Sequence, residues 1–286
     1  MNLSNNSLIV LPDIWYCNKL EKLDCSSNQI EVLPNELSNL YYLLQLQLHH
    51  NNIKNISGQL FTNWKKLKTI EIQYNKIEQL PSLTPLISLV RLDVRYNRLN
   101  QLPPVSSTLV IKELFFGFNQ ITKLEPLTFF QMKSLGYLEL QNNQIDVLPI
   151  EITNLSNLET LDIRNNSIRT IPFEIGKMNL IKLTLEGNMI KVIPSDVLNK
   201  GTRFILDHLK NKLQDNSTLT SAITVNTSSS DIYRFMQGNS TINFTGQNLK
   251  EVPSTVFELN LSIITKLILT KNQLTGNKLF YIIISI

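Results

Sequence analysis

The sequence predicts an α/β solenoid, a stack of similar repeats that each contain a short strand and a return segment. One asparagine recurs every 22–24 residues, apolar residues hold fixed places around it, and a proline often opens the segment that follows. A period this regular is typical of stacked repeats, which contact only their neighbours. The recurring asparagines are Asn6, Asn28, Asn51, Asn75, Asn97, Asn119, Asn143, Asn166 and Asn188.

The stretch 20–34 (LEKLDCSSNQIEVLP) shows the unit, which reads LxxLxCxxNxIxxLP. Its apolar positions alternate with polar ones, so we expect a short strand whose alternate side chains point into the stack. Complete units occupy residues 20–28, 43–51, 67–75, 89–97, 111–119, 135–143, 158–166 and 180–188. Residues 1–12 hold only the second half of a unit, so we expect an open edge and an incomplete chain. Nine strands would form a strip roughly 38 Å long.

The return segments begin at a recurring proline, which fixes φ and suits the first turn of a helix. These prolines are Pro34, Pro81, Pro103, Pro149, Pro172 and Pro194. Residues 36–43 and 151–158 then show apolar spacings of three or four. This spacing predicts a short helix or turn on the outer face.

The pattern changes near the end of the first solenoid, which we assign to residues 1–198. Residues 199–213 predict a closing helix with Thr202 as its N-cap. Its apolar face is expected at Phe204, Ile205, Leu209 and Leu213.

The last part of the chain divides into three segments. Residues 214–240 are rich in Ser, Thr and Asn, and we interpret them as a polar linker or loop. The period restarts over residues 241–275, the start of a second array, with Gln247 in place of the asparagine. Residues 276–286 form a truncated or irregular tail, whose apolar run is shorter than the roughly 20 residues that span a bilayer.

The composition excludes several classes of protein. The formal net charge of +4 does not call for a nucleic-acid partner, and no glycine-rich phosphate-binding motif is present. The two cysteines and the absence of a secretory leader favour a reducing compartment. We therefore expect a cytoplasmic protein, with the nucleus as the alternative, and no membrane, nucleic-acid or cofactor partner.

The repeated unit resembles the leucine-rich repeat of the intracellular type, LxxLxLxxNxLxxLP, over about residues 1–198 and 242–275. The resemblance implies a curved horseshoe, with a parallel sheet on the concave face, short helices or turns on the convex face, and a role in protein binding. The stretch LEGNMIKVIPSDVLNKGTRFILDHLKNKL is similar to a family segment that closes a run of repeats. The chain lacks the cysteine-rich caps that secreted members carry.

The same position of the unit, followed through successive repeats, is called a column here. Two columns have structural interpretations. The asparagine amides are expected to satisfy buried backbone groups and to bond one another from one repeat to the next, without a binding role. The outward position between the two central apolar residues is mainly acidic, which is common in such repeats or else serves a specific role. This column reads Asp24, Gln47, Glu71, Asp93, Phe115, Glu139, Asp162 and Thr184.

The position before the asparagine is the best candidate for function, because four consecutive repeats carry a ring there. Exposed aromatic residues beside arginines are the usual composition of interface hot spots. The alternative is that the rings only cover the edge of the sheet. The predicted partner-binding residues are His50, Tyr74, Tyr96, Phe118, Phe115, Arg91, Arg95, Asp93, Glu71 and Tyr137.

No catalytic or metal-binding constellation is predicted. His49 and His50 are adjacent on a strand, so we expect them to point apart. Cys25 falls in an inward apolar position, and Cys17 falls on a return segment. We predict no catalytic, cofactor-binding or metal-binding residue.

These observations predict a monomeric, non-enzymatic scaffold that binds a partner protein on its concave face. The partner is expected to bring a basic segment to Asp93 and Glu71. The alternative is the regulatory repeat arm of a larger signalling enzyme, such as a kinase, GTPase or ligase. A receptor ectodomain is disfavoured by the missing leader and caps.

Overall fold

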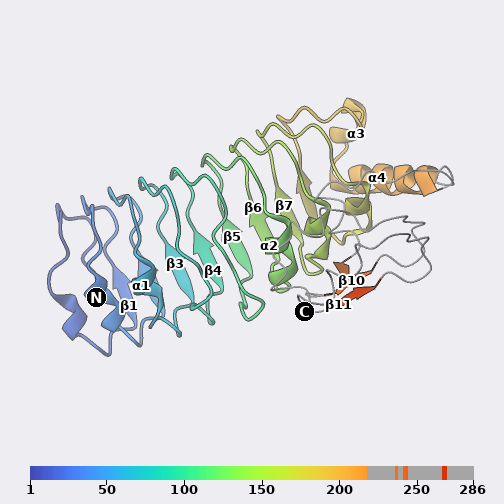
Figure 1. The fold of residues 1–286 in the computed structure, drawn as a ribbon. Helices are drawn as coiled ribbons and strands as arrows, with labels where there is room; N and C mark the ends of the chain where they lie inside the picture. The colour runs from blue at the N-terminus through green and yellow to red at the C-terminus, as the bar shows by residue number, and fades with distance from the viewer. Residues whose placement is uncertain (218–235, 238–240, 244–265, 269–286) are drawn as a thin grey trace, which may run out of the picture.

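The computed structural model describes residues 1–217, 236–237, 241–243 and 266–268. Eight short strands form one parallel sheet in which each strand pairs with the next along the chain (Figure 1). They are β1 (Lys22–Asp24), β2 (Gln45–Gln47), β3 (Thr69–Glu71), β4 (Arg91–Asp93), β5 (Glu113–Phe115), β6 (Tyr137–Glu139), β7 (Thr160–Asp162) and β8 (Lys182–Thr184). The predicted α/β solenoid is confirmed.

The strands are in register at their central apolar residue. Leu23 pairs with Leu46, and Leu46 pairs with Ile70, so the same side chain of each repeat lies above that of the next. These central residues are at most 2% exposed. The apolar residue after each strand, such as Cys25 or Leu48, is also buried. Stacking therefore makes one continuous core from units that could not bury an apolar face alone.

The first half-repeat adds a bridge rather than a ninth strand. Asn2 forms an isolated parallel bridge with Asp24, and the Leu3 N–H donates to the Asp24 carbonyl at 2.7 Å. The leading LxxL of the unit is absent at this end, so the pairing stays short. The sheet strip is accordingly eight strands wide, roughly 34 Å at the usual strand spacing.

The return segments are short helices or turns, as the spacing predicts. They include η1 (Ile14–Tyr16), η2 (Asn35–Asn39), α1 (Gly58–Phe61), α2 (Pro126–Gln131), η3 (Ile150–Asn154) and η4 (Phe173–Lys177). Pro34, Pro149 and Pro172 lie at the N-cap with extended backbone, one residue before the first turn expected for them. Proline suits the N-cap because its fixed φ is compatible with the extended backbone that this position adopts before the helix.

The asparagine column forms the hydrogen-bonded spine of the stack. The Asn51 amide donates to its own Leu48 carbonyl at 3.0 Å and to the Cys25 carbonyl of the preceding repeat at 2.9 Å. Its Oδ1 accepts from the Ile30 N–H at 2.9 Å. The same three contacts recur at Asn28, Asn75, Asn97, Asn119, Asn143, Asn166 and Asn188.

Each of these amides therefore bonds the backbone of the preceding repeat. The prediction that these amides satisfy buried backbone is confirmed. The prediction that the amides bond one another is wrong, because their donors and acceptor are already used by the main chain.

Two helices follow the last strand of the sheet: α3 (Ser195–Leu198) and α4 (Thr202–Ser217). The Leu183 N–H of β8 donates to the Thr202 hydroxyl at 2.9 Å, so this threonine supplies a partner to the edge of the sheet. A side chain at Gly176 would lie 2.4 Å from the Lys210 nitrogen, so α4 packs against η4 at a distance that only glycine allows.

The buried face of α4 differs in part from the predicted one. Ile205 and Leu209 are buried as expected, but Phe204 is 54% exposed. Only one of two adjacent helical residues can point into the core, since they lie about 100° apart around the axis. The helix also continues beyond residue 213, to Ser217.

Three further strands are described: β9 (Met236–Gln237), β10 (Thr241–Asn243) and β11 (Lys266–Ile268). β10 and β11 are parallel and pair Ile242 with Leu267, while β9 is antiparallel to β10. β9 lies inside the segment 214–240 that we interpret as a linker. Gln247 and the tail 276–286 lie outside the described residues. Among those that are described, no helix is long and apolar enough to cross a membrane.

Candidate functional site

The residue before each recurring asparagine has a left-handed backbone conformation. The φ angle is 55° at His50, 58° at Tyr74, 54° at Tyr96 and 57° at Phe118. Residues with a Cβ seldom adopt this region. The same conformation recurs down the column, at Asn5, Ser27, Asn142, Asn165 and Gly187.

Backbone hydrogen bonds between repeats hold this turn. The Tyr74 N–H donates to the Arg95 carbonyl at 3.0 Å, and the Asn75 N–H donates to the Tyr96 carbonyl at 3.2 Å. Because consecutive repeats make the same bonds, the conformation belongs to the repeat rather than to the side chain. The side chain in this column is thus free to vary.

The four rings of this column form a continuous stack, which we call the ring ladder (His50, Tyr74, Tyr96 and Phe118). The ring centroids are 4.3, 4.2 and 4.1 Å apart in chain order, with interplanar angles of 8°, 8° and 12°. Tyr74 remains 42% exposed. Since the inner faces cover one another, the ladder presents ring edges to solvent.

The left-handed turn also changes the histidine pair. The rings of His49 and His50 meet edge to face, with centroids 5.4 Å apart. The prediction that they point apart is therefore wrong, because the strand alternation ends before His50. The Nδ1 atom of His49 is buried without a hydrogen-bond partner in the described part of the chain.

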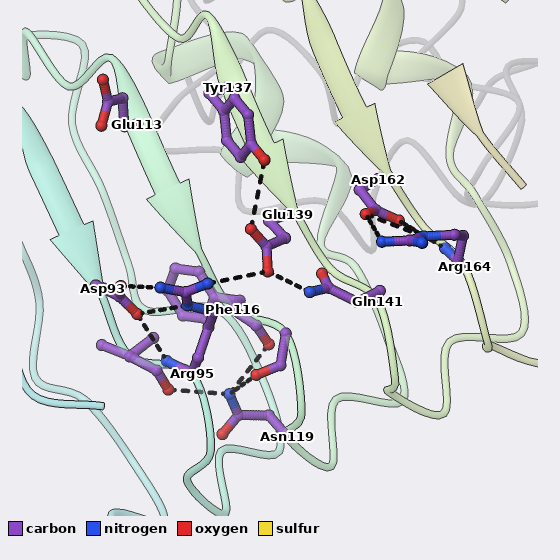
Figure 2. A network of polar contacts seen from close by, with 12 residues as sticks. Asp93, Arg95, Glu113, Phe116, Asn119, Tyr137, Glu139, Gln141, Asp162 and Arg164 are labelled. Carbon is purple, nitrogen blue, oxygen red and sulfur yellow. Dashed lines mark hydrogen bonds and ion pairs between the residues drawn. The ribbon is translucent and has the colours of Figure 1, made fainter. Parts of the chain in front are cut away.

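Asp93 lies at the centre of a charged network on the strands (Figure 2). Arg95 donates to it through Nε at 3.0 Å and through Nη2 at 2.6 Å, and Arg91 Nη2 lies 3.7 Å away. Asp93 is 1% exposed. Its carboxylate is engaged within the protein, so the expectation that it meets a basic segment of the partner is corrected.

Arg91 connects three strands. Its guanidinium pairs with Glu113 of β5 and lies 3.9 Å from Glu71 of β3, whose carboxylate also accepts from Gln47 at 2.9 Å. The same guanidinium lies over the Phe115 ring, 4.2 Å from its centroid. With the contact to Asp93, three ion pairs and a ring contact thus hold this long side chain in place.

Phe115 and Tyr137 complete the cluster. Arg95 lies 5.1 Å from the Phe115 centroid, and the Phe115 and Tyr137 rings are 4.9 Å apart. Phe115 is only 8% exposed, so it supports the arginines from below rather than offering a surface of its own. An exposed hot-spot role for Phe115 therefore has little support in this arrangement.

Glu139 extends the network to β6, where Figure 2 shows it between Arg95, Tyr137 and Gln141. Arg95 Nη1 lies 3.7 Å from Glu139, and Gln141 donates to the same carboxylate. A Cβ at Gly117 would lie 2.7 Å from the Gln141 amide, so the glycine leaves room for this side chain. Neither Gly117 nor Gln141 lies in a motif from which this contact could be predicted.

The pKa shifts follow from these contacts. The hydrogen bond to Asp93 raises the pKa of Arg95, although burial opposes it. Burial raises the pKa of Tyr137, and the nearby Glu139 adds to the effect. Burial alone would raise the pKa of Asp162, but the hydrogen bonds from Arg164 outweigh it and lower the pKa.

The described histidines, cysteines and carboxylates show how they are placed for metal binding and thiol chemistry. Residues 1–214 contain no group of three or more His, Cys, Asp or Glu that could hold a metal ion. Cys25 is buried, and burial raises the pKa of its thiol to about 12, while Cys17 is exposed on a return segment. The predicted site residues instead fall into the ring ladder and the network around Arg91 and Arg95.

Comparison with known proteins gives the same repeat. A family model described as "Leucine rich repeat" matches residues 42–99, 87–145 and 110–168, and a second of that description matches residues 19–40. Together they cover just over half of the chain. A crystal structure of an internalin (inlF) from Listeria monocytogenes superposes with a TM-score of 0.59, at 20% identity, over 97% of this chain and 75% of that one.

A shorter match is found in Dictyostelium discoideum. "MAP kinase phosphatase with leucine-rich repeats protein 1" is 40% identical over 65 residues, which are 23% of this chain and 8% of the relative. The chain thus matches only a small part of that protein.

Proposed function

Because the chain belongs to the leucine-rich repeat family, whose domains are generally protein-interaction modules, we propose that it is a non-enzymatic scaffold that binds a partner protein. The binding surface is the outward side of β3–β6 together with the ring ladder at the ends of these strands. The protein acts as a monomer in the cytoplasm or the nucleus, within intracellular signalling. Membranes, nucleic acids and cofactors have no part in this activity.

The ring ladder is the observation that carries the proposal. Four rings lie within 4.3 Å of their neighbours, and the two tyrosines add hydroxyl groups to an exposed apolar edge. Stacked rings are held in one conformation before the partner arrives, which reduces the entropy lost on binding. Rigid aromatic residues beside arginines are the groups that dominate interface energetics.

The charges of the network support a partner with basic residues. Four carboxylates (Glu71, Asp93, Glu113 and Glu139) face two guanidiniums (Arg91 and Arg95), so the cluster keeps a formal charge of −2. With Asp93 buried, the basic residues of the partner meet Glu71 and Glu113. This pairing steers association and selects the partner more than it adds affinity.

The decisive experiment replaces three rings of the ladder with asparagine, the residue that the same column carries at Asn142 and Asn165. Tyr74→Asn/Tyr96→Asn/Phe118→Asn keeps a residue type that tolerates the left-handed backbone. Proteins captured by the wild type and by this variant are compared by quantitative mass spectrometry. We expect specific partners to be lost at least about tenfold, the effect of removing a central hot spot.

The matched control carries three exposed rings from the return segments: Tyr16→Asn/Tyr41→Asn/Tyr42→Asn. It removes the same number of aromatic side chains away from the strands and should leave capture unchanged. Equal capture by the wild type and the ladder variant would overturn the proposed site.

A second candidate function is the regulatory repeat arm of a larger signalling enzyme. The match to a phosphatase that carries leucine-rich repeats favours it, since repeats of this kind accompany an enzyme in that protein. The sequence also resembles leucine-rich repeat-containing protein forty, in which repeats form the whole chain, and this favours the scaffold. Sequencing of the full-length transcript decides between them: a kinase, phosphatase, GTPase or ligase domain in the same reading frame would establish the arm.

A further inference from the structure

Three repeats carry an aspartate at the same strand position, and two of them pair it with an arginine two residues later. Asp93 is paired with Arg95 at 2.6 Å, and Asp162 with Arg164 at 2.7 Å. The third aspartate is Asp24 of β1, and the residue two positions later is Ser26. The Ser26 amide and hydroxyl donate to one oxygen of Asp24, at 3.0 and 2.6 Å.

Asp24 is consequently a carboxylate without a cation. Within residues 1–214 it makes no ion pair. Lys22, which holds the place of Arg91 in its repeat, does not reach it, and the amino group of Met1 donates to the Lys22 carbonyl instead. Asp24 is also partly exposed, in contrast to the buried Asp93.

The ring column is interrupted at the same repeat. Ser27 has the left-handed conformation of its neighbours, with φ of 53°, but no ring. The His50 ring stacks on Tyr74 with one face, and no ring from the preceding repeat covers the other. By contrast, Tyr96 is stacked on both faces. The two serines thus supply neither an arginine nor a ring at this repeat; Ser26 itself is 5% exposed, and the accessible groups are the Asp24 carboxylate and the His50 ring.

We infer that this place takes an arginine side chain of the partner protein. Its guanidinium pairs with Asp24, as Arg95 and Arg164 pair with their aspartates, and its flat face lies against His50. Arginine fits both requirements because it is planar, always charged and able to stack on rings. A lysine lacks the plane, and an aromatic side chain lacks the charge.

The inference rests on the proposed function only for the source of the arginine, and the site can be tested by itself. The probe is N-acetylarginine amide, titrated into the full chain labelled with ¹⁵N at pH 7.5. We expect saturable NMR shifts of the Ser26 and Ser27 amides and of the His50 ring protons, with a dissociation constant on the order of millimolar. N-acetylcitrulline amide, which is planar but uncharged, and N-acetyllysine amide should bind at least about tenfold more weakly.

Two variants sharpen the test. Asp24→Asn removes the charge with little change in shape and should weaken probe binding at least about tenfold. Ser26→Arg places after β1 the arginine that follows β4 and β7, so that the chain occupies its own site, and should abolish binding. Shifts that are equal for the three probes, or unchanged in both variants, would overturn the inference.

The outcome separates this inference from the proposed function. If the ladder variant loses partners but the arginine probe does not bind at Asp24, only the arginine site is wrong. If the probe binds as expected while the ladder variant keeps all partners, the proposed binding surface is wrong and the arginine site stands.

Discussion

The asparagine column and the column just before it are one residue apart in the chain, but their roles in the structure are different. The asparagines from Asn28 to Asn166 are 7–9% exposed and bond the backbone of two repeats. Their neighbours share an equally fixed backbone conformation, yet carry serine, histidine, tyrosine, phenylalanine, asparagine or glycine. A repeat can therefore hold one position for folding and leave the next free for recognition.

The largest effect is expected at the first column. Asn97→Ala leaves the Ile77 N–H without its partner and removes one of the two amide donors at each of the Ile72 and Val94 carbonyls, which keep their bonds from Asn75 and Asn119. A buried backbone group left without a partner costs about 1–3 kcal/mol and each further lost hydrogen bond about 0.5 kcal/mol or more, so we expect a loss of about 3 kcal/mol in the free energy of unfolding. Urea denaturation measures it.

The control for this change is the exposed Asn100→Ala, which should change stability by less than about 0.5 kcal/mol. A similar small loss at Asn97 would show that the spine does not depend on its side chains.

The second column should depend on backbone compatibility rather than on polarity. Tyr96→Val should be less stable than Tyr96→Asn by about 2 kcal/mol, because a β-branched residue is strained at a positive φ of 54°. Both variants lose the ring stack, so their difference isolates the backbone. Thermal unfolding of the pair checks this, and equal midpoints would contradict the claim that the turn belongs to the repeat.

A smaller effect is expected where the ladder ends. Ser27→Tyr adds a fifth ring next to His50, at a residue that already has the left-handed conformation. Aromatic pairs contribute about 1 kcal/mol, so we expect the free energy of unfolding to rise by that amount. Ser27→Asn serves as the control with no ring. A destabilised tyrosine variant would mean that His50 has no free face on this side.

The smallest effect on stability is expected for the ion pair between Asp162, at the outward strand position, and Arg164. The pKa of Asp162 is lowered in the folded state, so its pairing with Arg164 contributes stability above its unfolded pKa of about 3.9 and loses it as the pH falls through the folded value. Arg164 is partly exposed, so we expect less than about 1 kcal/mol. Urea denaturation between pH 2.5 and 7 should show a smaller acid loss for Arg164→Gln than for the wild type. Identical pH profiles would show that the pair contributes nothing.

Much of the fold follows from the sequence, because stacking repeats must bury the same positions each time. The eight complete units each contain one strand, and inward residues such as Leu23 and Cys25 are buried. The expected ninth strand is only a bridge because residues 1–12 lack the first half of a unit. A match to the repeat pattern does not tell how many backbone hydrogen bonds half a unit can make.

The candidate site could be predicted only in part. The sequence placed the rings in one column, but the left-handed backbone that aligns them was missed, although Asn142, Asn165 and Gly187 in the same column are the residue types that favour it. The ion pairs of Asp93 with Arg91 and Arg95 could not be inferred from the acidic residues at the outward strand position. It depends on how side chains from adjacent strands bend toward one another.

Thr202 has a consequence for assembly as well as for folding. The free edge of a parallel sheet is a template on which another chain can polymerise. At β8 the Leu183 N–H is already bonded to the Thr202 hydroxyl, so one small side chain stands where the backbone of an added strand would lie. The hydroxyl therefore takes up a backbone donor that an added strand would need, which limits pairing at this edge.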